Sequence, residues 1–538
     1  MLHLRLFNAG LVFLLSMLAA CSRQTESAAP APAPAPAQTS ASAAAPAAIA
    51  WQYAANESEV DAAFARARQD GKPLFLYWGA KWCPPCNQLS ATLFNRQDFI
   101  ERSRAFAPVY IDGDSPGAQK LGARFKVRGY PTMVLFNPQG TELTRLPGEV
   151  DAAQYTQVLT LSMSAQRPVS AVLADARTGG KGMSANDWRL LAFYSWETDE
   201  QQAVAKAELP AVLAQIAAAC PTEQEQASTR LMLKAVAATA KGARADPAAN
   251  QRVLRLLGDA AQARTQMDVL GNSATELVHA LSAPATPGRG QLLTAFDGAL
   301  RGLQADATLS RADRLTALSA RVELARIDVP NDGPASLPAP LLGELREHIA
   351  GADRDITDGY ERQAVIPFAA YVLQRAGLLD ESDALLQANL AKSHSPYYLM
   401  SELASNAKKR GDKEGALRWA EQAFASSVGP ATRLQWGASY VGSLVELAPQ
   451  DEARIETAAS QLLGEAAAQP DVFYERSARS LQRLGQRLQT WNKGGSHAAV
   501  LRRLQARVDT LCAALPAGDT QRAACEGLLK PSSTKGDA

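Results

Sequence analysis

Two cysteines separated by two prolines, Cys83 and Cys86, are the residues whose types and spacing most directly predict chemistry. Thiols with this spacing at the start of a helix lie on one face, within reach of a disulfide bond. Free N–H groups and the helix dipole at that end favour negative charge, so we expect an accessible Cys83 that ionises more readily than free cysteine. The thiolate is the attacking species in thiol–disulfide exchange. We therefore predict that Cys83 attacks and Cys86 resolves the mixed disulfide.

The residues around the two cysteines predict the elements that must hold them. Residues 74–78 are apolar and partly aromatic and lie between Pro73 and Gly79, which is typical of a short buried strand. Residues 87–94 have the pattern of a helix that begins at the cysteines, because prolines are tolerated in a first helical turn. A strand that leads into a helix opening with Cys-x-x-Cys is typical of a redox site.

The sequence Trp-Cys-Pro-Pro-Cys at residues 82–86, followed by Val-Arg-Gly-Tyr-Pro-Thr at residues 127–132, resembles the thioredoxin superfamily. Residues 51–163 are similar to the C-terminal periplasmic domain of DsbD-type thiol:disulfide interchange proteins, whose long helix after the motif resembles residues 81–99. The resemblance implies that Pro131 is a cis proline beside the disulfide, where backbone groups can pair with an extended substrate. It also implies substrate contacts for three neighbours of the site: Trp82, Tyr130 and Thr132.

Two positions depart from the pattern of that family. Tyr77 stands six positions before the first cysteine, where relatives often carry a buried acid that accepts a proton from the second cysteine. Pro108 stands on the next strand, where many thioredoxins have a lysine. Both departures concern the rate and direction of exchange, because the reaction itself needs only an accessible thiolate. We expect no cofactor.

The remaining segments of residues 51–165 predict the rest of a thioredoxin fold. Hydrophobic patterning predicts helices over residues 57–69, 116–125 and 151–162, the last capped by Asp151. It predicts further strands over residues 105–111, 132–136 and 141–146, the last two forming a hairpin. We expect this α/β domain to precede an all-α region.

The N-terminus predicts export and lipid attachment. Residues 1–20 have a charged start and a short apolar run, and Leu-Ala-Ala-Cys at residues 18–21 resembles a bacterial lipobox in which Cys21 is lipidated. An ordinary signal peptide is the alternative. Ser22 favours the outer membrane by the same resemblance, so we expect a periplasmic protein anchored through Cys21. Residues 21–50 are rich in Ala and Pro, which predicts a semi-rigid spacer.

Export also bears on the other cysteines, because disulfides persist in oxidising compartments. Cys512 and Cys525 flank a Pro- and Gly-containing turn between two helical patterns, so we predict a structural disulfide between them. Cys220 is left over and lies before Pro221 at the end of an Ala-rich helical pattern. We predict a buried, inert thiol there.

Residues 183–530 have helical periodicity almost throughout, after a stretch at residues 166–182 that we interpret as a linker. Ser184 and Ser310, each followed three residues later by Asp, predict helix starts. Two similar turns begin at Gly377 and Gly411, which are 411 − 377 = 34 residues apart, and each is followed by apolar residues at helical spacing. This interval resembles tetratricopeptide repeats, and an irregular bundle is the alternative.

Charge and histidine placement bear on partners and metals. The net charge is +1, from 55 Lys and Arg against 54 Asp and Glu, which gives no indication of nucleic-acid binding. The histidines of the helical region lack zinc-ligand spacing, so we predict no metal site and interpret each as a surface or structural residue. These four residues are His279, His348, His394 and His497.

Three functions follow from these patterns, and we favour the first. It is a membrane-anchored thiol–disulfide oxidoreductase that acts reductively on exported proteins, with the helical region selecting partners. A separate protein supplies electrons, because no apolar run after the N-terminus approaches the ~20 residues that cross a bilayer. The second is an interaction scaffold with a redox-silent module, motivated by Tyr77 and Pro108. The third is Cu(I) binding by Cys83 and Cys86, with Met133 as a nearby soft ligand.

Overall fold

The computed structural model describes residues 48–165, 167–199, 202–240, 242–329, 333 and 336–530. The predicted signal sequence, Cys21 and nearly all of the Ala/Pro-rich spacer lie outside the described residues. Among the helices of these residues, each is too short or too polar to span a bilayer.

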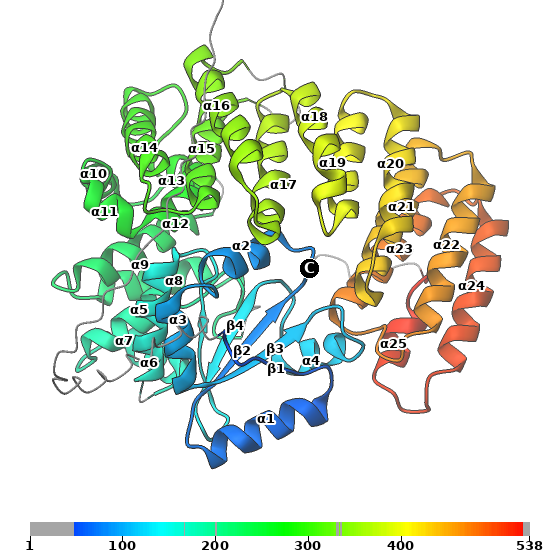
Figure 1. Ribbon diagram of the computed structural model, residues 1–538, viewed down its shortest axis with the longest axis horizontal. Helices are drawn as coiled ribbons and strands as arrows, with labels where there is room; N and C mark the ends of the chain where they lie inside the picture. Colours follow the sequence, from blue (N-terminus) through cyan, green and yellow to red (C-terminus); the bar gives the residue numbers. More distant parts are fainter. Residues whose placement is uncertain are drawn as a thin grey trace, which may run out of the picture. The chain divides into compact units, whose positions relative to one another are not determined.

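A five-stranded mixed sheet forms the first part of the fold (Figure 1). The strands are β1 (Gln52–Tyr53), β2 (Leu74–Gly79), β3 (Ala107–Asp112), β4 (Thr132–Phe136) and β5 (Glu142–Leu146). Their order is β1-β3-β2-β4-β5. β3 is parallel to both β1 and β2, whereas β4 is antiparallel to β2 and β5. The central strand β2 is therefore the one that ends at the cysteines.

Alternate residues of β2 face two separate cores, as strand geometry requires. Leu76 and Trp78 belong to a core cluster with residues of α1 and α4. Phe75 and Tyr77 belong to another cluster, which includes residues of α2, α3 and α5. The bounds of these helices are α1 (Glu57–Gln69), α2 (Pro84–Thr92), α3 (Gln97–Arg102), α4 (Ala118–Phe125) and α5 (Ala152–Met163). A short 3-10 helix, η1 (Ser103–Ala105), precedes β3.

The predicted α/β class with a following all-α region is confirmed. β4 and α1 have the predicted bounds, and Asp151 caps α5 by accepting backbone N–H groups of residues 153 and 154. β1 was not predicted, because two residues are too few to show a periodicity.

The predicted linker over residues 166–182 is wrong for residues 169–177, which form helix α6 (Val169–Arg177). Val172 and Leu173 of α6 are buried in the same cluster as Phe75 and Tyr77. The helical region therefore begins as part of the sheet's own core.

The helical region continues to residue 530, in teal to red in Figure 1. The helices that follow α6 are α7 (Ala185–Ala192), α8 (Leu209–Ala219), α9 (Glu225–Ala237), α10 (Pro247–Leu257), α11 (Ala260–Thr265), α12 (Met267–Asn272), α13 (Ala274–Leu281), α14 (Pro287–Ala305) and α15 (Arg311–Ala325). The later ones are α16 (Ala339–Asp355), α17 (Gly359–Arg375), α18 (Leu379–Asn389), η2 (Leu390–Lys392), α19 (Pro396–Lys409), α20 (Lys413–Ser426), α21 (Pro430–Leu447), α22 (Glu452–Ala467), α23 (Glu475–Trp491), α24 (Ala498–Ala513) and α25 (Gln521–Glu526).

The two predicted repeats coincide with the helix pairs α17–α18 and α19–α20. Gly377 and Gly411 end the first helix of each pair with positive φ angles of 81° and 78°. The residue after each glycine donates its N–H to the carbonyl five residues before it. These equivalent turns are typical of left-handed glycine caps. Assignment to tetratricopeptide repeats stays a prediction.

The helical region also contacts the helix that carries the cysteines. α17 packs against α2, and α23 packs against α4. In addition, Gln88 of α2 donates a hydrogen bond to Asp313 at the start of α15, with a distance of 2.8 Å. The two regions therefore meet around the Cys-Pro-Pro-Cys sequence.

Candidate active site

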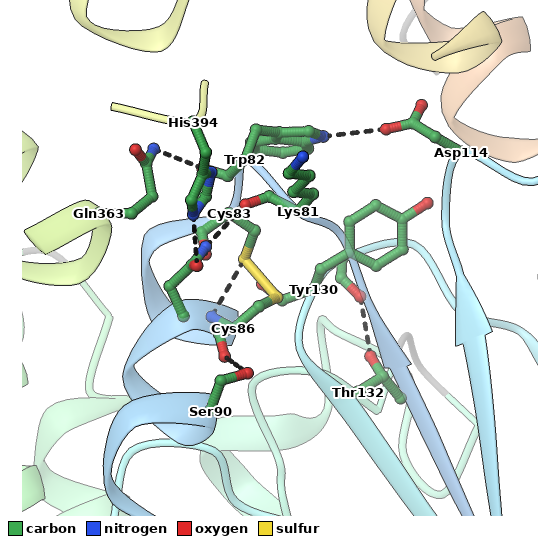
Figure 2. The surroundings of a disulfide bond; sticks show 12 residues. Lys81, Trp82, Cys83, Cys86, Ser90, Asp114, Tyr130, Thr132, Gln363 and His394 are labelled. Atoms are coloured by element: carbon green, nitrogen blue, oxygen red, sulfur yellow. Dashed lines mark hydrogen bonds between the residues drawn. A yellow bond between two sulfur atoms is a disulfide. The ribbon is translucent and has the colours of Figure 1, made fainter. Parts of the chain in front are cut away.

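The two cysteines of the motif are joined by a disulfide at the N-terminus of α2 (Figure 2). Their Cα atoms are 5.3 Å apart. Cys83 is the N-cap residue, and its Sγ accepts the backbone N–H of Cys86 at 3.3 Å. Pro84 and Pro85 occupy the first turn, where their missing N–H groups cost no helical hydrogen bond. In the reduced protein the same N–H group would stabilise a thiolate on Cys83.

The expectation of an accessible Cys83 is wrong for the disulfide form. Cys83 and Cys86 are each only 3% exposed. The cover comes partly from the neighbouring loop and partly from helices that the local sequence could not indicate, as the contacts described below show.

The loop before β4 supplies the backbone beside the disulfide. The Tyr130–Pro131 peptide bond is cis, and the carbonyl oxygen of Tyr130 lies 3.5 Å from Sγ of Cys83. Thr132 donates its hydroxyl hydrogen bond to the carbonyl of Gly129 at 2.9 Å, which holds the loop closed on itself. Tyr130 and Pro131 therefore lie beside the sulfurs, whereas the Thr132 hydroxyl stabilises the loop and does not face the disulfide.

Trp82 packs among aromatic rings from both parts of the chain. Its ring stacks with Tyr398 at a centroid distance of 6.0 Å and meets Trp436 edge-on at 5.4 Å. Tyr130 contacts its ring at 6.3 Å. The guanidinium of Arg476 lies 4.5 Å from the Trp82 ring centre, a cation–π contact. The residue predicted to contact substrate is thus covered by α19, α21 and α23.

Asp114 organises the polar contacts beyond Trp82. Its carboxylate accepts hydrogen bonds from the Trp82 indole at 3.2 Å and from the backbone N–H and hydroxyl of Thr432 at 2.8 and 2.6 Å. Arg476 lies 3.4 Å away and also donates to the Thr432 hydroxyl at 3.0 Å. Both charged side chains are nearly buried, at 8% exposure for Arg476 and 12% for Asp114. This network connects the thioredoxin-like part to α21 and α23.

The backbone of the cysteine loop is held by side chains on its other side (Figure 2). Asn87 donates to the carbonyls of Lys81 and Cys83, at 2.8 Å each. Because its amide nitrogen is committed to these acceptors, its oxygen accepts from Nε2 of His394 at 3.1 Å. Burial, with a smaller effect of Lys81, lowers the pKa of His394, which favours the neutral ring. Gln363 of α17 donates to the Trp82 carbonyl at 3.1 Å.

The two departures from the family pattern lie in the sheet. Pro108 pairs with Phe75 in the register of β2 and β3. Tyr77 is 3% exposed, and burial raises the pKa of its hydroxyl well above the usual value, with a smaller contribution from Tyr110. Tyr77 therefore stays protonated at neutral pH and cannot accept a proton as a buried carboxylate could.

The other candidate residues lie apart from this site. Cys512 and Cys525 are joined by a disulfide with Cα atoms 5.7 Å apart, and Cys220 is a buried free thiol. The sulfur of Met133 accepts a hydrogen bond from the Tyr155 hydroxyl at 2.9 Å in the buried core. In the part of the chain that the structure describes, no group of three or more His, Cys, Asp or Glu residues could hold a metal ion.

The sequence analysis missed the residues that cover the site from the helical region. The contact between Arg476 and Asp114 spans 362 positions of the chain, and that between Gln363 and Trp82 spans 281. Neither residue belongs to a local pattern that indicates chemistry. Correlated substitution in related sequences is the kind of signal that could reveal such contacts.

Comparisons with known proteins concern the part of the chain that carries Cys83 and Cys86. The model of a family described as thioredoxin-like domain matches residues 60–161. Thiol:disulfide interchange protein DsbD 1 of Pseudomonas aeruginosa is 32% identical over 120 residues, covering 22% of this chain and 20% of that protein. DsbD of Yersinia pestis is 33% identical over 116 residues, covering 21% and 19%. The chain thus spans about a fifth of the length of these relatives. Residues 60–161 form a thioredoxin-like domain that is similar to part of DsbD proteins.

Proposed function

We propose that this protein is a thiol:disulfide oxidoreductase that exchanges disulfides with other proteins through Cys83 and Cys86. The observation that carries the proposal is the disulfide at the N-terminus of α2, beside the Tyr130–Pro131 loop. Similarity of this domain to proteins named for thiol:disulfide interchange supports it.

The exchange conserves atoms and electrons. In the reduced protein, the Cys83 thiolate attacks one sulfur of a substrate disulfide, forms a mixed disulfide and releases the other substrate sulfur as a thiolate. Cys86 then attacks Sγ of Cys83, which releases the second substrate thiolate and forms the Cys83–Cys86 disulfide. Two electrons pass to the substrate. The proton from Cys86 goes to solvent or substrate, because Tyr77 is already protonated.

Insulin reduction by purified protein with dithiothreitol tests this activity. The wild type is expected to accelerate insulin precipitation, Cys83→Ser is expected to fall to the uncatalysed rate, and Cys220→Ser should behave as wild type. Cys86→Ala is expected to trap a substrate as a mixed disulfide on Cys83. Equal, uncatalysed rates for wild type and Cys83→Ser, together with no trapped species, would refute the proposal.

We further propose that the protein works in the periplasm, anchored to the outer membrane by lipid on Cys21, and acts reductively on exported proteins. The lipobox-like sequence at residues 18–21 supports the anchor. The electrons come from a separate redox protein. Metabolic labelling with an alkyne fatty acid, followed by membrane fractionation, tests the location. Label and membrane association should both be lost in Cys21→Ala, and a soluble, unlabelled wild-type protein would contradict the anchor.

The burial of both sulfurs favours a second candidate function, an interaction scaffold whose disulfide is redox-silent. At 3% exposure, neither sulfur can be reached by a protein thiolate unless the cover moves. A scaffold predicts that the disulfide resists dithiothreitol and that Cys83→Ser retains partner binding. The equilibrium constant of the Cys83–Cys86 disulfide against glutathione separates the candidates and also establishes the direction of exchange.

A further inference from the structure

A cavity of about 350 Å³ lies between the helix that carries the cysteines and the helical region. Pro84, Pro85 and Gln88 of α2 line one side of it, together with Gly148 and Glu149 after β5. Residues of α12, α15, α17 and α19 line the other side. It reaches solvent, because Tyr371 on its wall is 41% exposed. We call it the acidic cavity, for the charges described below.

The acidic cavity adjoins the redox site on two sides. Pro84 and Pro85 are the residues between the two cysteines. Gly148 packs so closely on the loop that a Cβ added to it would lie 3.1 Å from Cγ of Pro131. A substrate polypeptide bound beside Pro131 therefore lies next to this cavity. The cavity walls can contact the substrate residues that flank its reacting cysteine.

The walls combine aromatic surface with negative charge. Phe368 and Tyr371 of α17 and Tyr398 of α19 supply the rings, whereas Glu149 and Glu402 contribute carboxylates. Asp313 also lines the cavity, but its carboxylate accepts from Gln88 and Ser310. None of the described residues that line the cavity is a lysine or an arginine.

Glu149 and Glu402 are the carboxylates of this cavity that have no hydrogen-bond or ion-pair partner among the described residues. Across the described residues, neither makes a hydrogen bond or ion pair with another side chain or with the backbone. The side chain of Glu149 is exposed and that of Glu402 is half-buried. Desolvation by the surrounding cavity walls raises the pKa of both carboxyl groups, and Lys234 and Lys409, respectively, act in the opposite direction. A cation that enters relieves this cost of desolvation, and aromatic rings beside carboxylates are favourable surroundings for lysine and arginine side chains.

We propose that the acidic cavity binds a positively charged segment next to the reacting cysteine of the substrate protein. The substrate class is therefore a polypeptide with lysine or arginine beside its cysteine. This inference rests on the proposed exchange activity and adds a specificity to it. Glu149 and Glu402 are its specificity-determining residues.

Single-turnover reduction of three peptide disulfides tests the inference. The peptides are symmetric dimers of one short sequence that carries lysines, alanines or glutamates beside its cysteine. Full-length protein is first reduced with dithiothreitol and desalted, and thiol release is followed by quenched flow. Each rate is divided by that of the same peptide with glutathione, which removes the effect of flanking charge on the thiols themselves. The variants are Glu149→Gln, Glu402→Gln and, as a matched control on the exposed face of α16, Glu347→Gln.

The wild type and Glu347→Gln are expected to reduce the lysine peptide at least about five-fold faster than the glutamate peptide. Glu149→Gln and Glu402→Gln should each lower this ratio, with little effect on the alanine peptide. A normalised ratio near one in the wild type, or an unchanged ratio in both folded glutamine variants, would overturn the inference. Absence of exchange with all three peptides would instead refute the proposed activity.

Discussion

Replacing Arg476 by leucine is expected to accelerate the chemical reduction of the Cys83–Cys86 disulfide. Arg476 comes from α23, and its guanidinium lies on the ring of Trp82 and beside Asp114. These contacts exist only while the helical region covers the sulfurs. Because a reductant must reach the sulfur of a cysteine that is only 3% exposed, the rate of reduction depends on how often the cover opens. Arg476→Leu lowers the free energy of opening.

The magnitude follows from the contacts of Arg476 with Trp82 and Asp114, which a leucine cannot make. Its bonds to Thr432 and Gln435 lie within the helical region and are lost equally whether the cover is open or closed. A largely desolvated cation–π contact contributes about 1–2 kcal/mol, and a hydrogen-bonded charge pair contributes a similar amount. Asp114 keeps its bonds to Trp82 and Thr432 in the variant, so part of its burial cost stays compensated. A net destabilisation of the cover by about 2 kcal/mol corresponds to about 30-fold faster reduction when opening precedes the reaction.

The assay follows the thiols released by dithiothreitol with a maleimide that shifts mobility on a gel. Arg454→Leu is the matched control, because Arg454 also lies over an aromatic ring, that of Tyr440 at 5.6 Å, and pairs with Glu421 at 2.9 Å. It belongs to the same helical region but not to the cover. Equal rates in wild type and Arg476→Leu, or the same acceleration in Arg454→Leu, would show that the cover does not control access.

Three further predictions concern residues away from the active site. Burial raises the pKa of the Cys220 thiol to about 11, so iodoacetamide at pH 8 should label Cys220 only after denaturation. The protonated thiol is favoured in the folded state, so its contribution to the free energy of unfolding should be lost as pH rises from about 9 through 11. Replacing both Cys512 and Cys525 by serine should lower the free energy of unfolding by about 3 kcal/mol, because their disulfide closes a loop with a sequence separation of 13. Asp268→Asn should lower the free energy of unfolding, measured with urea, by about 3–5 kcal/mol, because it leaves the fully buried Arg230 without its carboxylate partner. A decrease below about 1 kcal/mol would contradict this.

The thioredoxin-like part was predictable because its signals are local. Apolar residues with a strand pattern predicted β2, which ends one residue later than expected, at Gly79. The α1 helix begins after Asn56, whose side chain accepts the N–H of Glu59, a cap that short-range chemistry determines. The cysteine spacing is equally local, whereas the place of Pro131 beside the disulfide was implied only by the resemblance to thioredoxins.

The predictions failed where burial came from distant segments. Residues 166–182 were predicted to be a linker, yet residues 169–177 form α6, because the core of the sheet buries Val172 and Leu173. Likewise, nothing near Cys83 indicates that helices almost 300 to 400 positions away close over it. A motif defines which bond can react, whereas access to that bond depends on tertiary contacts that a single sequence does not reveal.

The contacts between the two regions differ in kind along the helical region, and this difference indicates where the cover opens. Near its start, α6 to α9 share one continuous apolar core with the sheet, so separating them would expose a large buried surface. Farther along, α17 packs directly against α2, whereas α21 and α23 contact Trp82 and Asp114 through hydrogen bonds, an ion pair and aromatic rings. Each such polar contact contributes only about 1 kcal/mol, and water can replace it. Opening on the side of α21 and α23, with α6 to α9 and α17 fixed, is therefore the least costly way to bring a substrate sulfur to Cys83. It also leaves in place the wall that α17 contributes to the acidic cavity.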